Sequence, residues 1–403
     1  MDQVRFGIVG FGAMGLEHAQ IMLEKVPEVR LAAVATRNEK NIAALRALPG
    51  GGQVRVFDTP QEMYASGKID AVLIASPHRA HVAQAKEAFA AGMHVLLEKP
   101  TGVFTREVRE LNAAADASGR AFGAMLNQRT NPAYRRMKEI VASGELGEIR
   151  RTSMIVTDWF RAQSYFDSGS WRATWKGEGG GVLLNQAMHS LDLWQWIGGM
   201  PVRLRAFCGL GRWHDIEVED DVTAYVEYAN GATGLLMACT GEAPGTNRFE
   251  LSMDGGQLLL EDGRLLLRRT AVPVSRFIRE YPGGYGKPEI TQEDITPDAD
   301  NPMHAGVTRA FARHILYGEP MIADGREGLN ALELANAMLL SSAEERTLEL
   351  PFDAETDARY EKLLEGRAAC SREKTARAVQ LNVGKSYRMI SSGPGWLHAC
   401  RGH

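Results

Sequence analysis

Residues 4–15 of the 403-residue chain read VRFGIVGFGAMG, and they decide the fold of its first part. The apolar run Val4–Val9 predicts a buried strand, and a helix is expected from about Leu16 to Lys25. Between them stands the pattern G-x-G-x-x-G, formed by Gly10, Phe11, Gly12, Ala13, Met14 and Gly15. The first glycine permits a tight turn, the second lets the backbone approach a pyrophosphate, and the third allows close packing of helix on strand. Because a helix N-terminus also attracts anions, these residues predict a dinucleotide site.

The end of the second predicted strand, Leu31–Ala35, bears on the type of dinucleotide. An NAD site usually has Asp or Glu there, to hold the ribose 2′-hydroxyl. Here Thr36 and Arg37 follow, and a guanidinium can bind a 2′-phosphate through two parallel hydrogen bonds. We therefore expect both residues to contact the cofactor and favour NADP over NAD. In the alternative, Arg37 is simply exposed and Glu39 takes the usual acidic role.

Strand and helix signals alternate through the first 126 residues. Further strands are expected at 54–57, 70–75, 95–97 and 121–125, with helices from Pro60, His81 and Thr105 between or after them. This alternation predicts an α/β fold, a doubly wound parallel Rossmann sheet over residues 1–126.

Two of these strands end in residues that suit a ligand site. Residues 94–100 read HVLLEKP, and the proline stops the strand and keeps Lys99 extended. Open α/β sheets bind ligands at the carboxyl ends of their strands. We therefore expect Ser76-Pro77-His78 and Glu98-Lys99-Pro100 to face the nicotinamide half of the cofactor. In the alternative, Lys99 is a solvated lysine at a strand end.

Beyond residue 127 the pattern changes to antiparallel strands. A helix is expected from Asn131 to Ser143, then a long β-rich run over 151–159. Three turn signals, at Asn230-Gly231, 254–256 and Asp262-Gly263, each separate two strand-like runs and predict successive hairpins. One face of such an open sheet needs cover from helices or a second subunit. We expect an α/β domain over residues 127–352, built on a large, mostly antiparallel sheet, and a homodimer or homotetramer packed sheet to sheet.

A helix is expected from Val182 to Ile197, after three consecutive glycines at 179–181. Asn185, His189 and Asp192 recur at helical spacing on one polar side, which is either a solvated face or a ligand-facing one. Before it lies a segment rich in aromatic residues and arginine, including Trp159, Trp171-Arg172 and Trp175. Aromatic faces beside polar side chains suit a sugar ring. The alternative is an edge of the core with surface arginines.

The composition is that of an ordinary globular protein, with 44% hydrophobic and 24% charged residues. The formal net charge of -4 argues against a nucleic-acid partner, and neither a membrane partner nor a metal site is expected. The four cysteines are scattered without metal-ligand spacing, as free thiols of a reducing compartment would be. With no signal segment in the sequence, we expect a cytoplasmic protein.

With the glycine turn, Glu98-Lys99-Pro100 and the Gly179–Asp192 stretch in this order, the chain resembles the Gfo/Idh/MocA family over roughly residues 3–352. That resemblance implies a Rossmann domain plus an α/β domain with an open sheet, often in dimers or tetramers. It also implies hydride transfer between C4 of the nicotinamide and a secondary alcohol carbon of a sugar, glycoside or cyclic polyol.

Carried over by residue, the resemblance implies that Lys99 and His189 match the family lysine and histidine. Many members have an aspartate where this chain has Asn185, and an amide cannot accept a proton. His189 then becomes the expected general base, Lys99 orients the reacting hydroxyl, and Asn185 positions substrate or nicotinamide. Asp192 is expected to be structural.

Other positions complete the expected site. Pro77 and His81 match the family turn after the fourth strand, whereas His78 stands where Asn is common. Arg172 is the foremost expected substrate contact, with Trp159 and Trp175 beside it. The residues expected to line the same cleft from the end of the sixth strand are Asn127, Gln128 and Arg129.

Residues 271–403 are predicted to contain one long loop, three helices and a flexible tail. Residues 271–302 are expected to form a long loop, followed by helices over His304–Tyr317 and Gly328–Glu345, the second packing back on the first domain. Residues 353–403 are expected to hold a further helix, over Arg359–Arg377, and a flexible tail from Gln380.

Two other functions remain open at this point. One is a glycosidase on the same fold that keeps its NAD bound and recycles the hydride. The other is a non-catalytic nucleotide-binding sensor, which the presence of both Lys99 and His189 disfavours.

Overall fold

The computed structural model describes residues 2–377 and contains two sheets. The first has six parallel strands in the order β3-β2-β1-β4-β5-β6. They are β1 (Val4–Val9), β2 (Val29–Ala35), β3 (Arg55–Phe57), β4 (Ala71–Ile74), β5 (His94–Leu97) and β6 (Phe122–Ala124). The predicted doubly wound Rossmann sheet is confirmed. Its strand order reverses between β1 and β4, which is where such sheets open a crevice for ligands.

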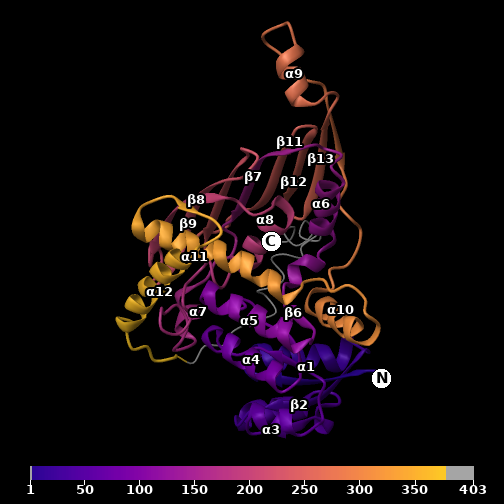
Figure 1. Ribbon diagram of the computed structural model, residues 1–403, viewed down its shortest axis with the longest axis vertical. Helices are drawn as coiled ribbons and strands as arrows, with labels where there is room; N and C mark the ends of the chain where they lie inside the picture. The colour runs from indigo at the N-terminus through magenta and orange to yellow at the C-terminus, as the bar shows by residue number, and fades with distance from the viewer. Residues whose placement is uncertain (1, 378–403) are drawn as a thin grey trace, which may run out of the picture.

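Helices cover both faces of this sheet (Figure 1). They are α1 (Ala13–Lys25), α2 (Glu39–Ala47), α3 (Pro60–Ala65), α4 (His81–Ala90) and α5 (Thr105–Ser118). One more comes from late in the chain: α10 (Met303–Tyr317) packs against α1 and β1. Phe311 of α10 meets Phe6 of β1 edge to face, with ring centroids 6.1 Å apart. The first core is therefore completed by a helix from the other end of the sequence.

The second sheet has nine strands in the order β14-β13-β12-β11-β7-β10-β9-β8-β15. They are β7 (Ile149–Val156), β8 (Arg203–Leu210), β9 (Glu219–Glu227), β10 (Thr233–Cys239), β11 (Asn247–Met253), β12 (Gly256–Glu261), β13 (Arg264–Thr270), β14 (Ile290–Asp294) and β15 (Leu348–Glu349). All three predicted hairpins form, and β10 pairs with β7 in parallel. The mostly antiparallel second sheet is thus confirmed.

One face of the second sheet is covered by helices α6 (Pro132–Ser143), α8 (Met188–Gly198) and α11 (Gly328–Glu344) (Figure 1). Strands β8, β9 and β10 also carry large apolar side chains that are exposed to solvent: Phe207, Tyr225, Leu235 and Met237. In the part of the chain that the structure describes, no helix is long and apolar enough to cross a membrane.

Three predicted boundaries were wrong. The expected loop 271–302 contains α9 (Val274–Glu280) and β14, because the edge of β13 pairs with β14 despite the Gly- and Pro-rich sequence. The expected helix 182–197 begins only at Met188, because the chain before it turns and bonds to β9. The last helix, α12 (Ala354–Ala369), begins and ends earlier than expected, with the Asp353 carboxylate accepting from Thr356 N at its start. The predicted tail from Gln380 lies outside the described residues.

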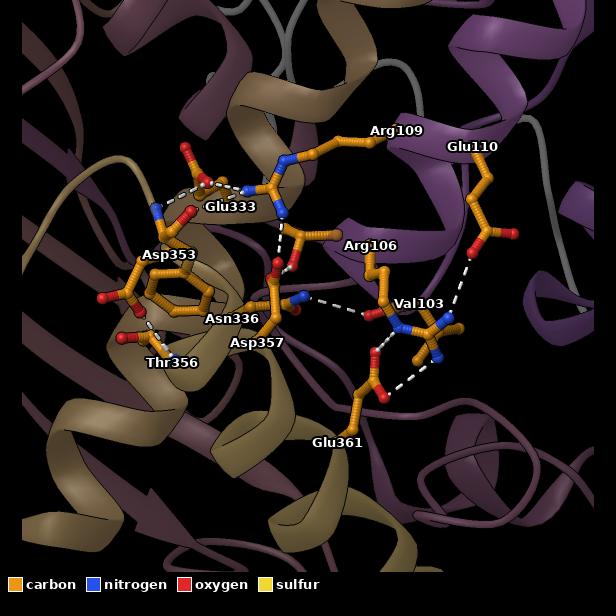
Figure 2. A network of polar contacts seen from close by, with 12 residues as sticks. Val103, Arg106, Arg109, Glu110, Glu333, Asn336, Asp353, Thr356, Asp357 and Glu361 are labelled. Atoms are coloured by element: carbon orange, nitrogen blue, oxygen red, sulfur yellow. Dashed lines mark hydrogen bonds and ion pairs between the residues drawn. The ribbon is translucent and has the colours of Figure 1, made fainter.

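Polar contacts tie α11 and α12 to α5, as predicted for α11 (Figure 2). The Arg109 guanidinium donates to Glu333 at 2.7 Å and to Asp357. Asp357 also accepts from Thr105 Oγ1 at 2.5 Å, and Asn336 Nδ2 donates to Val103 O at 3.0 Å. Both carboxylates that face Arg109 are buried, so one cation neutralises two desolvated acids at this contact.

Replacing this cation tests the contact. Arg109→Met leaves Glu333 and Asp357 buried without a positive partner, so we expect a loss of about 2–3 kcal/mol in the free energy of unfolding. Arg106→Met is the matched control, because its partner Glu361 is only half-buried and the pair should contribute less than about 1 kcal/mol. Urea denaturation of both variants measures the difference. Equal losses in the two variants would contradict this account of Arg109.

Candidate active site

The glycine turn between β1 and α1 has the predicted geometry. Gly10 has a φ of +81°, and a Cβ there would lie 2.4 Å from Ser76 N, so the turn needs glycine. A Cβ on Gly15 would lie 2.6 Å from Gly10 O, which reflects the close packing of α1 on β1. A Cβ on Gly12 would meet nothing within 4 Å. The N-terminus of α1 therefore opens onto free space at the crevice, which fits an anion such as a pyrophosphate.

The ends of β4 and β5 are joined through His81. Its Nδ1 lies 2.7 Å from Pro100 O, and its Nε2 lies 2.7 Å from Ser76 O. His81 is buried, so its ring joins the two strand ends from inside. Pro77, by contrast, is exposed beside Ser76, and His78 is buried with Nδ1 3.2 Å from Glu178 O. The two strand ends that were expected to lie together do so.

Lys99 leaves the end of β5 and contacts the segment before α8. Its Nζ donates to Asn185 O at 3.1 Å. Burial lowers the pKa of Lys99, and the carboxylates of Glu98 and Glu178 oppose that shift. Lys99 N also donates to Glu98 Oε2 at 3.0 Å, which fixes the backbone beside the ammonium.

Glu98 is held by a histidine of α1. His18 Nε2 donates to Glu98 Oε1 at 2.7 Å. Burial would raise the pKa of Glu98, but the hydrogen bond and charge of His18 lower it to about 2. Over residues 2–377, His18, Glu98 and His304 are the one set of potential metal ligands whose donor atoms lie within 4.8 Å of one another. The direct bond between His18 and Glu98 already satisfies two of those ligand atoms.

His189 lies in the first turn of α8, four residues after Asn185. Burial, reinforced by the charge of Lys99, lowers the pKa of His189 to about 3. Its Nδ1 is buried and has no hydrogen-bond partner among the described residues. The imidazole is therefore neutral at physiological pH, which is the form that accepts a proton.

Glu178 and Tyr165 belong to the same network, although neither was predicted as a site residue. Asn185 Nδ2 donates to Glu178 Oε1, and lies 3.3 Å from Tyr165 OH. Ala173 N donates to the other oxygen of Glu178 at 2.6 Å. An acidic residue directly before three glycines was the signal available for Glu178. Tyr165 stood in the aromatic segment without a pattern that marked it.

Arg172 also belongs to this network. Its NH1 donates to Tyr165 OH at 2.9 Å, and its guanidinium lies over the rings of Tyr165 and Trp171, 4.7 and 4.5 Å from their centroids. Trp159 and Trp175 are nearly buried, and each ring is covered by an arginine, Arg161 and Arg367 respectively. Arg172 therefore joins the aromatic segment to Asn185.

Asn127, Gln128 and Arg129, which follow β6, were all expected to line the cleft. Arg129 does not line the cleft, because it is buried and its guanidinium pairs with both oxygens of Asp192, at 2.8 and 2.7 Å. This contact makes Asp192 structural, as expected. Asn127 Nδ2 donates to His304 Nε2 at 2.8 Å, and Gln128 Nε2 lies 3.7 Å from Met303 Sδ. Asn127 and Gln128 are buried as well, and their side chains meet the start of α10.

Two family models match the chain. The model described as "Oxidoreductase family, NAD-binding Rossmann fold" matches residues 4–125, and that described as "GFO/IDH/MocA C-terminal domain" matches residues 134–259. Together they cover more than half of the sequence.

Individual proteins agree with these models. The rhizopine catabolism protein MocA of Rhizobium meliloti is 29% identical over 62% of this chain and 78% of its own length. Inositol 2-dehydrogenase of Rhizobium meliloti (strain 1021) is 25% identical over 86% of this chain and 99% of its own. The WlbA dehydrogenase of Bordetella pertussis, solved with NADH and UDP-GlcNAcA, is 25% identical, with a TM-score of 0.70 over 87% of this chain and 100% of its own. The chain belongs to the Gfo/Idh/MocA family of oxidoreductases with an NAD-binding Rossmann fold.

Proposed function

We propose that the chain is an NAD(P)-dependent dehydrogenase that oxidises a secondary alcohol carbon of a sugar, glycoside or cyclic polyol. The observation that carries the proposal is the contact between Lys99 Nζ and Asn185 O. It joins the carboxyl edge of the nucleotide-binding sheet to the segment that carries Asn185 and His189. Relatives named inositol 2-dehydrogenase and D-glucoside 3-dehydrogenase support this substrate class.

Each reacting group has one role in this proposal. A dinucleotide held at Gly10–Gly15 would supply the nicotinamide as hydride acceptor for the alcohol carbon. His189 takes the hydroxyl proton through its neutral imidazole. Because a pKa of about 3 makes this imidazole a weak base, the proposal also requires the charge of Lys99 to lower the pKa of the alcohol. Lys99 orients the hydroxyl and stabilises negative charge on its oxygen, and Asn185 positions the substrate through hydrogen bonds.

The cofactor contacts follow the crevice. We infer that Gly10–Gly15 receive the pyrophosphate, and that Ser76–His78 with Glu98, Lys99 and Gln128 border the nicotinamide half. His81 acts there by holding the two strand ends together. Arg37 is exposed and follows β2 without a carboxylate at residues 36–38, which supports NADP as the cofactor. NAD is the alternative, with Glu39 on the ribose.

We further infer that residues 1–126 form the cofactor-binding domain and residues 127–352 the substrate-binding domain, with residues 353–403 as a C-terminal extension. The residues proposed to contact substrate are Arg172, Asn127, Trp159 and Trp175. The exposed apolar side chains on β8–β10 support a homodimer or homotetramer packed sheet to sheet. The free thiols of Cys208, Cys239 and Cys370 fit a cytoplasmic location.

Removing the proton acceptor or the ammonium tests the assignment of roles. His189→Ala and Lys99→Ala should each lower kcat by about 10²–10⁴, because each removes a group that acts on the reacting oxygen. Steady-state turnover with a panel of sugars and cyclitols measures this, and Lys287→Ala, on an exposed loop, is the control. NADPH fluorescence titration should show that both variants still bind cofactor. Near-normal turnover in either variant would refute its role.

The role of Arg37 has a separate test. Arg37→Ala should weaken NADPH binding by about tenfold and leave NADH binding within twofold, since only the 2′-phosphate pairs with the guanidinium. Fluorescence titration with each nucleotide, after a check for co-purified cofactor, gives both dissociation constants. Equal effects on the two nucleotides would exclude the 2′-phosphate contact. Cofactor that stays bound and never exchanges would instead favour the hydride-recycling glycosidase.

The shifted pKa values predict the pH profile of kcat/KM for alcohol oxidation. Lys99 works as the cation, so activity should fall as pH rises through its lowered pKa, with a midpoint below the usual 10.5. His189 works as the neutral base with a pKa of about 3, so no loss should occur near the ordinary histidine value of 6.5. In the residual activity of Lys99→Met the alkaline limb should disappear. An acidic limb centred near 6.5 would contradict the environment described for His189.

A further inference from the structure

The chain after α12 turns back across the segment that carries Arg172. We call residues 370–377 the strap and residues 163–178 the substrate segment. The substrate segment has little regular structure, with the five-residue helix α7 (Gln163–Asp167) followed by turns. It nevertheless carries Tyr165, Arg172 and Glu178, which form the substrate side of the site. Contacts from elsewhere in the chain must therefore hold its shape.

Glu217 provides the first of these contacts. One carboxylate oxygen accepts from Ser371 Oγ at 2.8 Å and from Trp175 N at 3.3 Å, and the other accepts from Arg372 N. Ser371 Oγ in turn accepts from Lys176 N at 3.0 Å. One carboxylate thus joins the beginning of the strap to the end of the substrate segment.

Lys374 provides the second contact, further along the strap. Its Nζ donates to Phe166 O at 2.9 Å and to Arg172 O at 3.0 Å. Three residues on, Arg377 N donates to Asp167 O at 2.8 Å. A single ammonium therefore spans the two ends of the turn that leads from α7 to Arg172. Because both acceptors are backbone carbonyls, it fixes the path of the main chain rather than one rotamer.

The position of that main chain decides the geometry of the site. Phe166 is adjacent to Tyr165, whose hydroxyl meets both Arg172 and Asn185. A shift of Phe166 or Arg172 would separate the guanidinium from Tyr165 and move the Tyr165 hydroxyl away from Asn185. None of these contacts reaches the glycine turn between β1 and α1. The substrate segment does meet the nucleotide side where His78 Nδ1 lies 3.2 Å from Glu178 O, but Lys374 bonds to other residues of that segment. The strap should therefore influence the substrate side more strongly than nucleotide binding.

We propose that the strap determines substrate affinity by holding the substrate segment in its binding shape, with Lys374 as the positioning residue. This inference rests on the proposed function for its kinetic consequence, but the contact itself can be measured without turnover. Lys374 acts through the backbone of Phe166 and Arg172 and does not touch substrate or cofactor.

The experiment compares full-length Lys374→Met with wild type, with Lys374→Arg as the conservative variant and the exposed Lys287→Met as the control. Amide hydrogen exchange over residues 163–178 measures the holding contact, and steady-state kinetics measures its effect. For Lys374→Met we expect at least tenfold faster exchange in this segment and a KM for substrate about tenfold higher. The kcat and the NADPH dissociation constant should stay within about twofold of wild type. Lys374→Arg should recover most of the affinity, because it keeps a multi-donor cation.

Each outcome decides a separate point. Unchanged exchange in Lys374→Met would overturn the strap as the holding element. Faster exchange with unchanged KM would overturn its effect on substrate affinity. Weakened NADPH binding or faster exchange throughout the chain would show a general loss of structure instead, and would also overturn the proposal. If wild type oxidises no sugar or cyclitol, the proposed function fails, while the exchange data still decide whether Lys374 holds the segment.

Discussion

The partial burial of the Lys99 ammonium is the constraint on which the rest of the site depends. A desolvated cation is costly unless oxygen atoms and opposite charge surround it. Those groups come from both parts of the chain: Glu98 from the end of β5, and Asn185 O and Glu178 from the region before α8. The ammonium therefore lies where the two parts of the chain meet and takes its polar neighbours from both. Burial lowers the pKa of His189, and the charge of Lys99 lowers it further.

That docking is enforced by the path of the chain. After building the second sheet, the chain returns through α10 to complete the core against Phe6, and then through α11 and α12 to pack on α5. The Arg109 contacts with Glu333 and Asp357 lie within this return path (Figure 2). Buried ion pairs of this kind add little net stability, because desolvation offsets their attraction, but wrong placement leaves a buried charge unpaired. They therefore suit a contact whose main task is to set position.

Structural features that follow from a local sequence pattern were predicted correctly. Features that depend on contacts between residues far apart in the sequence were not. The glycine turn, the parallel strands and the three hairpins follow from spacing alone, and each formed as predicted. Arg129 was misplaced because its partner Asp192 lies 63 residues away, and no local pattern records that pair. Glu178 and Tyr165 entered the network through Asn185, a neighbour known only from the fold. The helical spacing of polar residues in 182–197 predicted a helix, but it could not show that contacts with β9 delay the start of that helix to Met188.

The delayed start of α8 has an identifiable cause. Buried Glu219, at the start of β9, accepts from Gly181 N at 2.8 Å and from Leu183 N at 3.1 Å, while its carbonyl accepts from Val182 N at 2.9 Å. A Cβ on Gly181 would lie 2.0 Å from that carbonyl, so only glycine allows this approach. The segment that leads to Asn185 and His189 is thereby anchored to an interior strand of the second sheet, as Lys99 is anchored to the first sheet. Arg172, in contrast, lies on a segment without regular structure. Lys99 and His189, which are proposed to act on the reacting hydroxyl, thus lie at the end of β5 and in the first turn of α8. Arg172, which is proposed to bind the rest of the substrate, lies on a segment whose shape depends on separate contacts. This division allows substrate preference to change without disturbing the positions of the reacting groups.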